Sequence, residues 1–113
     1  MRIAAPSPLR RVFASNDTYA SLALAWAQSR RVQVPEDFQV IGFDGTDTVR
    51  TLLPELASVV QPIDALAERA VQRLTEAIAA ETEEDAEPAD VRGGEDVLPV
   101  TLRLGGTVRP ARD

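Results

Sequence analysis

The sequence contains no cysteine, no histidine and no lysine among its 113 residues. Without cysteine the chain cannot form disulfides or thiolate metal sites. Without histidine it lacks the usual zinc ligand and the commonest acid–base catalyst. Aromatic residues are scarce at 4%, whereas the hydrophobic fraction of 44% suffices for the core of one modest domain. We therefore expect no disulfide, no metal site and no cofactor.

The sequence also lacks any hydrophobic run long enough to span a membrane. Its first stretch, MRIAAPSPLRR, carries prolines and arginines in place of the continuous apolar core of a secretory signal. These features predict a soluble, cytoplasmic protein without a membrane partner.

Negative charge is concentrated in one segment, although the net charge of the whole chain is −6. Eight acidic residues lie from Glu81 to Asp96 against the single base Arg92, while elsewhere ten acids face eleven arginines. An acidic run that contains proline and glycine is typical of a solvated loop. No basic stripe suits a phosphate backbone, so the chain itself is a poor candidate for nucleic-acid binding.

Strand and helix patterns alternate along the rest of the chain. Strand patterns cover residues 10–15, 38–43, 57–61 and 97–104. Helix patterns cover residues 18–31 and 63–80, and the stretch 48–56 can form a short helix that Pro54 ends. The apolar run of 38–43 indicates a strand buried on both faces, and Pro99 favours an edge position for the last strand. The order predicts an α/β fold with a mainly parallel sheet and flanking helices. The helix at 18–31 is apolar on most sides, so we expect this domain or a partner to cover it twice.

Polar side chains follow the first three strands of this predicted sheet. Asn16 and Asp17 come after the first strand, Asp44 after the second, and Gln61 after the third. The carboxyl ends of parallel strands meet at one edge of a sheet, where ligands bind in open α/β folds. Carboxylate and amide groups suit a hydroxyl-rich ligand such as a sugar or nucleoside. We predict a ligand site at Asn16, Asp44 and Gln61, with no catalytic residue.

Each of these polar residues also has a purely structural interpretation. Asn16 and Asp17 can cap the helix that follows them. Asp44 can belong to a turn, and Gln61 can lead into the next helix. Asp47 can be the N-cap of the short helix. It is the coincidence at one sheet edge that favours binding.

Four stretches in a fixed order carry a family likeness: VFASNDTYASLAL, VPEDFQVIGFDGTD, LPELASVVQPIDALAERAV and LPVTLRLGG. Together they resemble the C-terminal part of the effector-binding domain of LacI/GalR-type bacterial transcription regulators, from Arg11 to Gly106. Periplasmic sugar-binding proteins share the fold and related elements. The VPED turn and the QP before the last helix are more regulator-like.

The resemblance implies a periplasmic-binding-protein-like fold whose cleft takes a sugar, a nucleobase or a similar small molecule. By this resemblance, Asn16, Asp44 and Gln61 match positions that face the effector. Asp17 matches the residue that caps the helix after the first strand. The resemblance also implies a homodimer that forms through the helix from residue 18 and the segment around residues 52–53.

The sequence departs from the family pattern in three respects. Ile63 stands where sugar binders often carry an aromatic residue, which argues against a stacked pyranose. The DNA-binding helix-turn-helix and the N-terminal lobe have no counterpart, so DNA would be a partner only through a domain absent from this chain. The acidic loop at 81–96 is longer than usual in the family. We expect a fragment with a flexible lead-in at 1–10, a partial effector-binding domain at 11–106 that includes this loop, and a tail at 107–113.

Three other classes of function are compatible with parts of the sequence: a phosphatase, a receiver-like domain and a binding or dimerisation fragment. The stretch FDGTD resembles half of the Asp-x-Asp-x-Thr loop of haloacid-dehalogenase-type phosphatases, but Gly42 stands in place of one of the two carboxylates. A lysine for the phosphate is missing as well, which also argues against a receiver-like regulatory domain. The remaining alternatives are a fragment of a periplasmic-type sugar-binding protein and a dimerisation-only module that has lost ligand binding.

Overall fold

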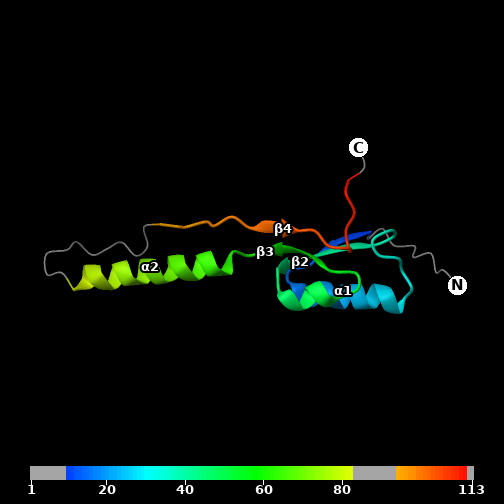
Figure 1. Ribbon diagram of the computed structural model, residues 1–113, viewed down its shortest axis with the longest axis horizontal. Coiled ribbons are helices and arrows are strands. Elements are labelled where there is room, and N and C mark those ends of the chain that lie inside the picture. Colours follow the sequence, from blue (N-terminus) through cyan, green and yellow to red (C-terminus); the bar gives the residue numbers. More distant parts are fainter. Residues whose placement is uncertain (1–9, 83–93, 112–113) are drawn as a thin grey trace. The chain divides into compact units, whose positions relative to one another are not determined.

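The computed structural model describes residues 10–82 and 94–111 of the chain. The elements follow one another as β1 (Arg11–Phe13), α1 (Asp17–Ser29), β2 (Gln39–Asp44), a 3₁₀ helix (Asp47–Thr51), β3 (Ala57–Val60), α2 (Ile63–Glu81) and β4 (Thr101–Arg103). This alternation confirms the predicted α/β class (Figure 1).

The four strands form one sheet in the order β1-β2-β3-β4. The first three are parallel, with Val12 opposite Val40 and Gly42 opposite Ser58. β4 is antiparallel to β3 and lies at the edge of the sheet, as Pro99 predicts. The sheet is therefore mainly parallel, and the carboxyl ends of β1, β2 and β3 share one side of it.

α1 packs against the sheet and encloses the core. On its inner side Ala20 and Ala27 have no exposed surface and Leu24 is 2% exposed. The two alanines let the helix approach β2 closely, where Val40 is also fully buried. Burial of Leu24 alone contributes about 2 kcal/mol of hydrophobic stabilisation. The helix thus fixes the strands whose ends carry the candidate ligand residues.

The outer side of α1 remains apolar and exposed among the described residues. Tyr19, Leu22 and Trp26 are 60%, 60% and 48% exposed. They are three and four positions apart, so they share one face of the helix. The sequence predicts that this helix is covered on two sides. The described part of the chain covers only one of them.

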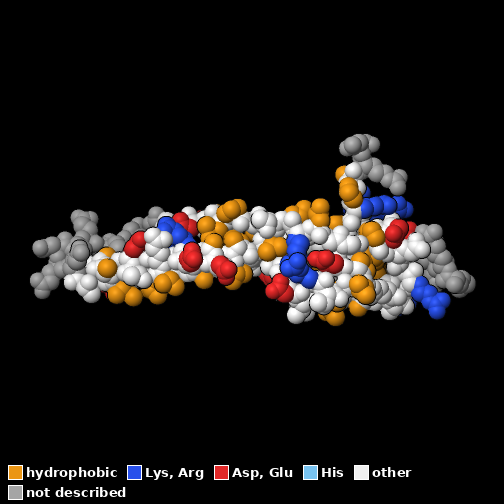
Figure 2. Space-filling model, viewed as in Figure 1, with side chains coloured by type: hydrophobic (Ala, Val, Ile, Leu, Met, Phe, Trp, Pro, Cys, Tyr) orange, Lys and Arg blue, Asp and Glu red, His pale blue; other side chains and the backbone are white. Residues whose placement is uncertain are grey.

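The chain divides into two compact units: residues Met1–Gln61 together with Val100–Asp113, and residues Pro62–Pro99. The second unit is built on α2, a 19-residue helix that buries none of its residues. Its exposed large apolar side chains are those of Ile63, Leu66, Val71, Leu74 and Ile78. In Figure 2 hydrophobic side chains gather along this helix. The helix predicted at 63–80 is thus present, but its apolar stripe lies at the surface.

β2 shows where the strand prediction was wrong. Burial alternates along the strand, with Val40 and Gly42 buried and their neighbours only half-buried. The buried positions are those that face α1, while the opposite face of the strand is less covered. A continuous apolar run therefore does not correspond to burial on both faces here.

Parts of the predicted organisation lie outside the described residues, namely the lead-in up to residue 9 and the acidic segment 83–93. Thr107, the first residue of the predicted tail, is fully buried. Within residues 10–82 and 94–111, no helix has both the length and the apolar character that crossing a membrane requires.

Candidate functional site

Asp44 ends β2 in an unusual backbone conformation. Its φ is 119°, and the φ of the next residue, Gly45, is 75°. A positive φ is uncommon for any residue other than glycine and costs free energy unless the surroundings impose it. The local fold therefore directs the Asp44 side chain into a specific position at the carboxyl edge of the sheet.

Asp44 and Gln61 form a hydrogen-bonded pair at this edge. The Gln61 Nε2 donates to Asp44 Oδ1 at 2.6 Å, and the Gln61 backbone N–H donates to the Asp44 carbonyl oxygen at 3.2 Å. Parallel pairing of β2 with β3 brings the two residues together, since Asp44 lies opposite Val60 in the register. Both side chains are half-buried, so they remain accessible to a small molecule.

Asn16 has the structural role that its position allows. It is the N-cap of α1, and its Oδ1 accepts a hydrogen bond from the Tyr19 backbone N–H at 2.8 Å. The hydrogen bonds of the described residues join Asp44 to Gln61 and leave Asn16 outside this pair. The ligand-binding role of Asn16 stays a prediction.

Asp17 is not a helix cap, and the implied capping role is wrong. It is the first residue of α1, and the residue is 2% exposed. Oδ1 accepts from the Ser58 hydroxyl at 2.6 Å, and Oδ2 accepts from the Thr46 backbone N–H at 2.7 Å and from the Thr46 hydroxyl at 2.9 Å. Asp17 therefore ties the start of α1 to β3 and to the loop after Asp44.

The sequence carries a signal for this contact that its periodicity does not show. Gly42 and Ser58 are a glycine and a small polar residue within otherwise apolar strands, and they are paired in the sheet. A Cβ atom on Gly42 would collide with Asp17 Oδ1. The two small residues make room for a buried carboxylate.

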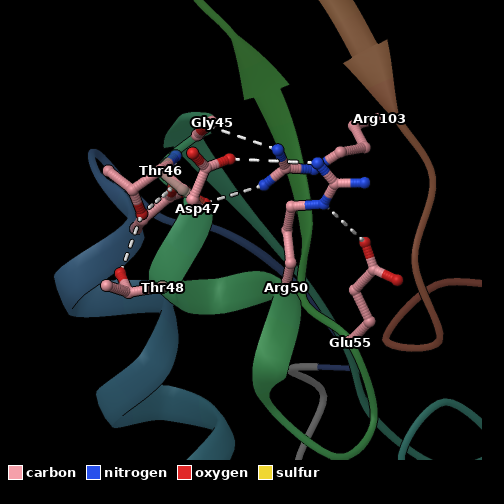
Figure 3. Close-up of polar contacts among 8 residues, drawn as sticks. Gly45, Thr46, Asp47, Thr48, Arg50, Glu55 and Arg103 are labelled. Atoms are coloured by element: carbon pink, nitrogen blue, oxygen red, sulfur yellow. Dashed lines mark hydrogen bonds and ion pairs between the residues drawn. The ribbon is translucent and has the colours of Figure 1, made fainter.

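Asp47 does not cap the 3₁₀ helix, contrary to the sequence prediction. The N-cap is Thr46, which makes no side-chain capping bond. The Asp47 side chain is 94% exposed, and its Oδ1 lies 3.9 Å from Arg50 Nη1 (Figure 3). Arg50 Nε also lies 3.9 Å from Glu55 Oε1. These are loose surface ion pairs of small energetic weight.

Two other features do not add to the site. Across residues 10–82 and 94–111, no group of three or more acidic side chains is arranged to hold a metal ion. A groove of about 660 Å³ is lined by residues of three strands and of the segment after β4, namely Arg11, Gln39, Ile41, Leu102, Leu104 and residues 108–111. Neither Asp44 nor Gln61 lines it, so this groove is separate from the pair at the carboxyl edge.

The sequence matches a known domain family over most of its length. The profile of the periplasmic binding protein-like domain covers residues 2–104. The regulator IdnR of Escherichia coli is 36% identical over 72 residues, which are 64% of this chain and 22% of that protein. Catabolite control protein A of Priestia megaterium is 37% identical over 71 residues, 63% of this chain and 21% of that protein. The chain thus spans about a fifth of the length of these two relatives.

Solved structures show the same relationship. A LacI-family transcriptional regulator from Sanguibacter keddieii superposes with a TM-score of 0.78 at 30% identity, over 90% of this chain and 36% of that one. A LacI-family regulator from Enterococcus faecium, solved with bound ribose, gives a TM-score of 0.74 at 27% identity, over 95% of this chain and 37% of that one. The fold described above is therefore part of a larger known architecture.

Proposed function

The chain belongs to the family of periplasmic binding protein-like domains, and on this premise we propose that its carboxyl sheet edge forms part of the effector site of a LacI-type transcription regulator. The observation that carries the proposal is the 2.6 Å hydrogen bond between Gln61 and Asp44 where β3 and β2 end. A carboxylate accepts hydrogen bonds and an amide both donates and accepts, so adjacent hydroxyl groups of one ligand can satisfy the pair.

The ligand class we propose is a sugar or a similar polyhydroxylated molecule. The Enterococcus faecium neighbour holds ribose, and a further neighbour at 26% identity and a TM-score of 0.70 is the regulator CelR in complex with cellobiose. Asn16 would be a third contact. Because its Oδ1 is engaged by the helix cap, its amide nitrogen is the group that would donate to the ligand.

The proposed role is sensing without catalysis. Asp44 is paired with an amide, and a phosphatase would require a second carboxylate beside it and a metal ion. Regulation of transcription would place the protein in the cytoplasm, and contact with DNA would need a domain other than this one.

A titration followed by NMR tests the ligand proposal. For a site formed by one sheet edge we expect a dissociation constant of about 1 mM or weaker, and 1 mM is equivalent to about −4 kcal/mol. We expect D-ribose or cellobiose to shift the Gln61 side-chain amide and the Gly45 backbone amide. Asp44→Ala should abolish both shifts, whereas Asp47→Asn, at an exposed carboxylate nearby, should retain them. Absence of shifts in the wild-type chain with both sugars would overturn the proposal.

We further propose that the outer side of α1 is a homodimer interface. Its exposed residues Tyr19, Leu22 and Trp26 continue into the segment that carries Leu53, which is 86% exposed. The Gln28 Nε2 donates to the Leu53 carbonyl oxygen at 2.7 Å, so the helix and this segment are held together. Large apolar side chains grouped on a surface are typical of protein interfaces.

Sedimentation equilibrium tests the dimer. We expect wild-type chain to associate reversibly and Leu22→Glu to weaken the association by more than about tenfold, because a charge would enter the centre of the apolar interface. Val71→Glu makes the same change at an exposed position of α2 and serves as the matched control. Equal effects of the two substitutions would contradict an interface centred on α1.

A further inference from the structure

The dipeptide Gly45–Thr46, directly after Asp44, has all four of its backbone polar groups hydrogen-bonded. The Gly45 N–H donates to Ser58 Oγ at 3.0 Å, and the Thr46 N–H donates to Asp17 Oδ2 at 2.7 Å. The two carbonyl oxygens both accept from Arg103: Nη1 donates to Gly45 at 3.3 Å and Nη2 to Thr46 at 3.0 Å. Such complete pairing is unusual for a short surface loop, which normally bonds partly to water.

These bonds reach the loop from three separate elements. Asp17 begins α1, Ser58 lies in β3, and Arg103 ends β4. Figure 3 shows the Arg103 guanidinium extending across to the loop, beside Gly45 and Thr46. The planar guanidinium can donate to two carbonyl oxygens at once, and a lysine ammonium cannot reproduce this geometry.

Arg103 makes these contacts although its own Nε remains buried and without a hydrogen-bond partner among the described residues. A buried donor left unpaired is unfavourable. Of the three side-chain nitrogens of Arg103, only the two terminal ones are therefore hydrogen-bonded in the described structure. Its two bonds to the loop are the interactions that this placement provides.

We propose that Arg103 is a positioning residue for the ligand-binding carboxylate, which it acts on through the Gly45–Thr46 loop. By fixing both carbonyl oxygens of the loop, Arg103 holds Asp44 at its positive φ and keeps Oδ1 in line with Gln61 Nε2. A ligand hydroxyl then meets a carboxylate that is already oriented, so little conformational freedom is lost on binding. The ligand part of this inference rests on the function proposed above.

Arg50 offers a matched comparison because its guanidinium lies in the same region of the structure (Figure 3). Its contacts with Asp47 and Glu55 are both 3.9 Å long, and its side chain is 58% exposed. It makes no hydrogen bond to the Gly45–Thr46 carbonyl oxygens in the described structure. Removal of its charge should therefore leave Asp44 undisturbed.

The test compares Arg103→Met with Arg50→Met in the full 12.2 kDa chain by NMR. The first readout needs no ligand: the coupling between the amide proton and Hα of Asp44, which is small at a φ of 119° and large in an ordinary extended strand. The second readout is the shift of the Gln61 side-chain amide. We expect Arg103→Met to raise the coupling and to move the Gln61 amide, with both unchanged in Arg50→Met.

A titration with D-ribose then measures the effect on binding. We expect Arg103→Met to weaken the affinity by about tenfold, or about 1.4 kcal/mol, and Arg50→Met to bind like the wild type. Wild-type values of the Asp44 coupling in Arg103→Met, or equal changes in both variants, would overturn the proposal. If Arg103→Met fails to fold, Arg103→Lys replaces it. The lysine keeps the positive charge but lacks the two parallel N–H donors of the guanidinium. Arg103→Lys should therefore change the Asp44 coupling and the ribose affinity in the same direction but by less, and wild-type values would count against the proposal.

The outcome also separates the two proposals. If ribose shifts no resonance of the wild-type chain, the ribose-binding function fails, and with it the ligand role of Arg103. The Asp44 coupling constant still decides whether Arg103 orients that residue.

Discussion

The carboxylate of Asp17 accepts a hydrogen bond of 2.6 Å from the hydroxyl of Ser58 in a region closed to solvent. Asp17 is 2% exposed and Ser58 is fully buried. The two residues are 41 positions apart in the chain, and the bond joins the start of α1 to the middle of the sheet. The polar edge that carries Asp44 therefore rests on a buried polar contact as well as on the apolar core.

Loss of the Asp17 carboxylate should destabilise the fold strongly. Asp17→Ala would leave the fully buried Ser58 hydroxyl and the partly buried Thr46 backbone N–H without their acceptor. We expect the free energy of unfolding to fall by about 3 kcal/mol, because hydrogen bonds to a charged group are lost and a buried donor is left unpaired. Urea denaturation measures the change.

The exposed Asp47 provides the control for that substitution. Asp47→Ala removes a side chain that is 94% exposed and lies 3.9 Å from its arginine partner. We expect a change within about 0.5 kcal/mol, as is usual for surface positions. Similar losses from the two alanine substitutions would contradict a structural role specific to Asp17.

Gly42 should tolerate no side chain. A Cβ atom there would overlap Asp17 Oδ1 and lie 3.1 Å from the Ala20 Cβ and 3.2 Å from the Asp17 Cα, so α1 would have to move off β2. We expect Gly42→Ala to destabilise the chain by about 2 kcal/mol, which is typical of overpacking in a tight core. Thermal and urea unfolding both report it. Gly94→Ala is the control, since its nearest contact would be the flexible end of Arg73 at 3.3 Å, and a comparable loss there would argue against crowding as the cause.

The sequence predicted the helices and strands more completely than it predicted the contacts of the site. Periodicity and turn residues placed the four strands and the two long helices, because these signals are local, and the parallel strand order brought Asp44 and Gln61 to one edge as expected. The short helix predicted at 48–56 is instead a 3₁₀ helix at Asp47–Thr51. The family resemblance is confirmed by the matching domain profile and by the LacI-family neighbours. The predicted functions of Asn16, Asp44 and Gln61 as ligand contacts stay predictions.

Local sequence patterns could not predict the roles of Asp17 and Arg103. The bond between Arg103 and Thr46 joins residues 57 positions apart, and that between Asp17 and Thr46 joins residues 29 positions apart. Such pairs depend on register and on the order of strands in the sheet, which a single sequence does not specify. Asp17 could equally have capped its helix, since both Asn16 and Asp17 are residue types that do so.

Thr107 should contribute more to stability than its position after the last strand suggests. Its hydroxyl donates to the Val40 carbonyl oxygen at 2.7 Å and accepts from the Ala57 N–H at 2.9 Å, so it bridges β2 and β3. Thr107→Val keeps the shape but removes both bonds in a fully buried place. We expect a loss of about 2 kcal/mol in urea denaturation. Thr101→Val, on the exposed side of β4, is the control, and equal losses would contradict the bridging role.

The pairing of Arg69 with Asp96 in the second unit should make its local structure sensitive to acid. The Arg69 Nε donates to Asp96 Oδ2 at 2.6 Å, and Arg73 Nη1 lies 3.6 Å from the same oxygen. The hydrogen bond from Arg69 lowers the pKa of Asp96, aided by the positive charges of both arginines. A folded-state pKa below the unfolded value means that the contact is fully stabilising above the unfolded pKa and is lost as the pH falls through the folded one.

A carboxyl NMR titration of Asp96 checks this sign and its cause. We expect Arg69→Gln to return the Asp96 pKa most of the way to its ordinary value, because the principal cause of the depression is the hydrogen bond from Arg69. Arg73→Gln should raise the pKa less, since Arg73 acts on Asp96 only through its charge at 3.6 Å. Salt should weaken both effects, because the groups are partly exposed and their attraction is screened. Equal rises in the two variants would show that charge alone, without the short hydrogen bond, holds the Asp96 pKa down.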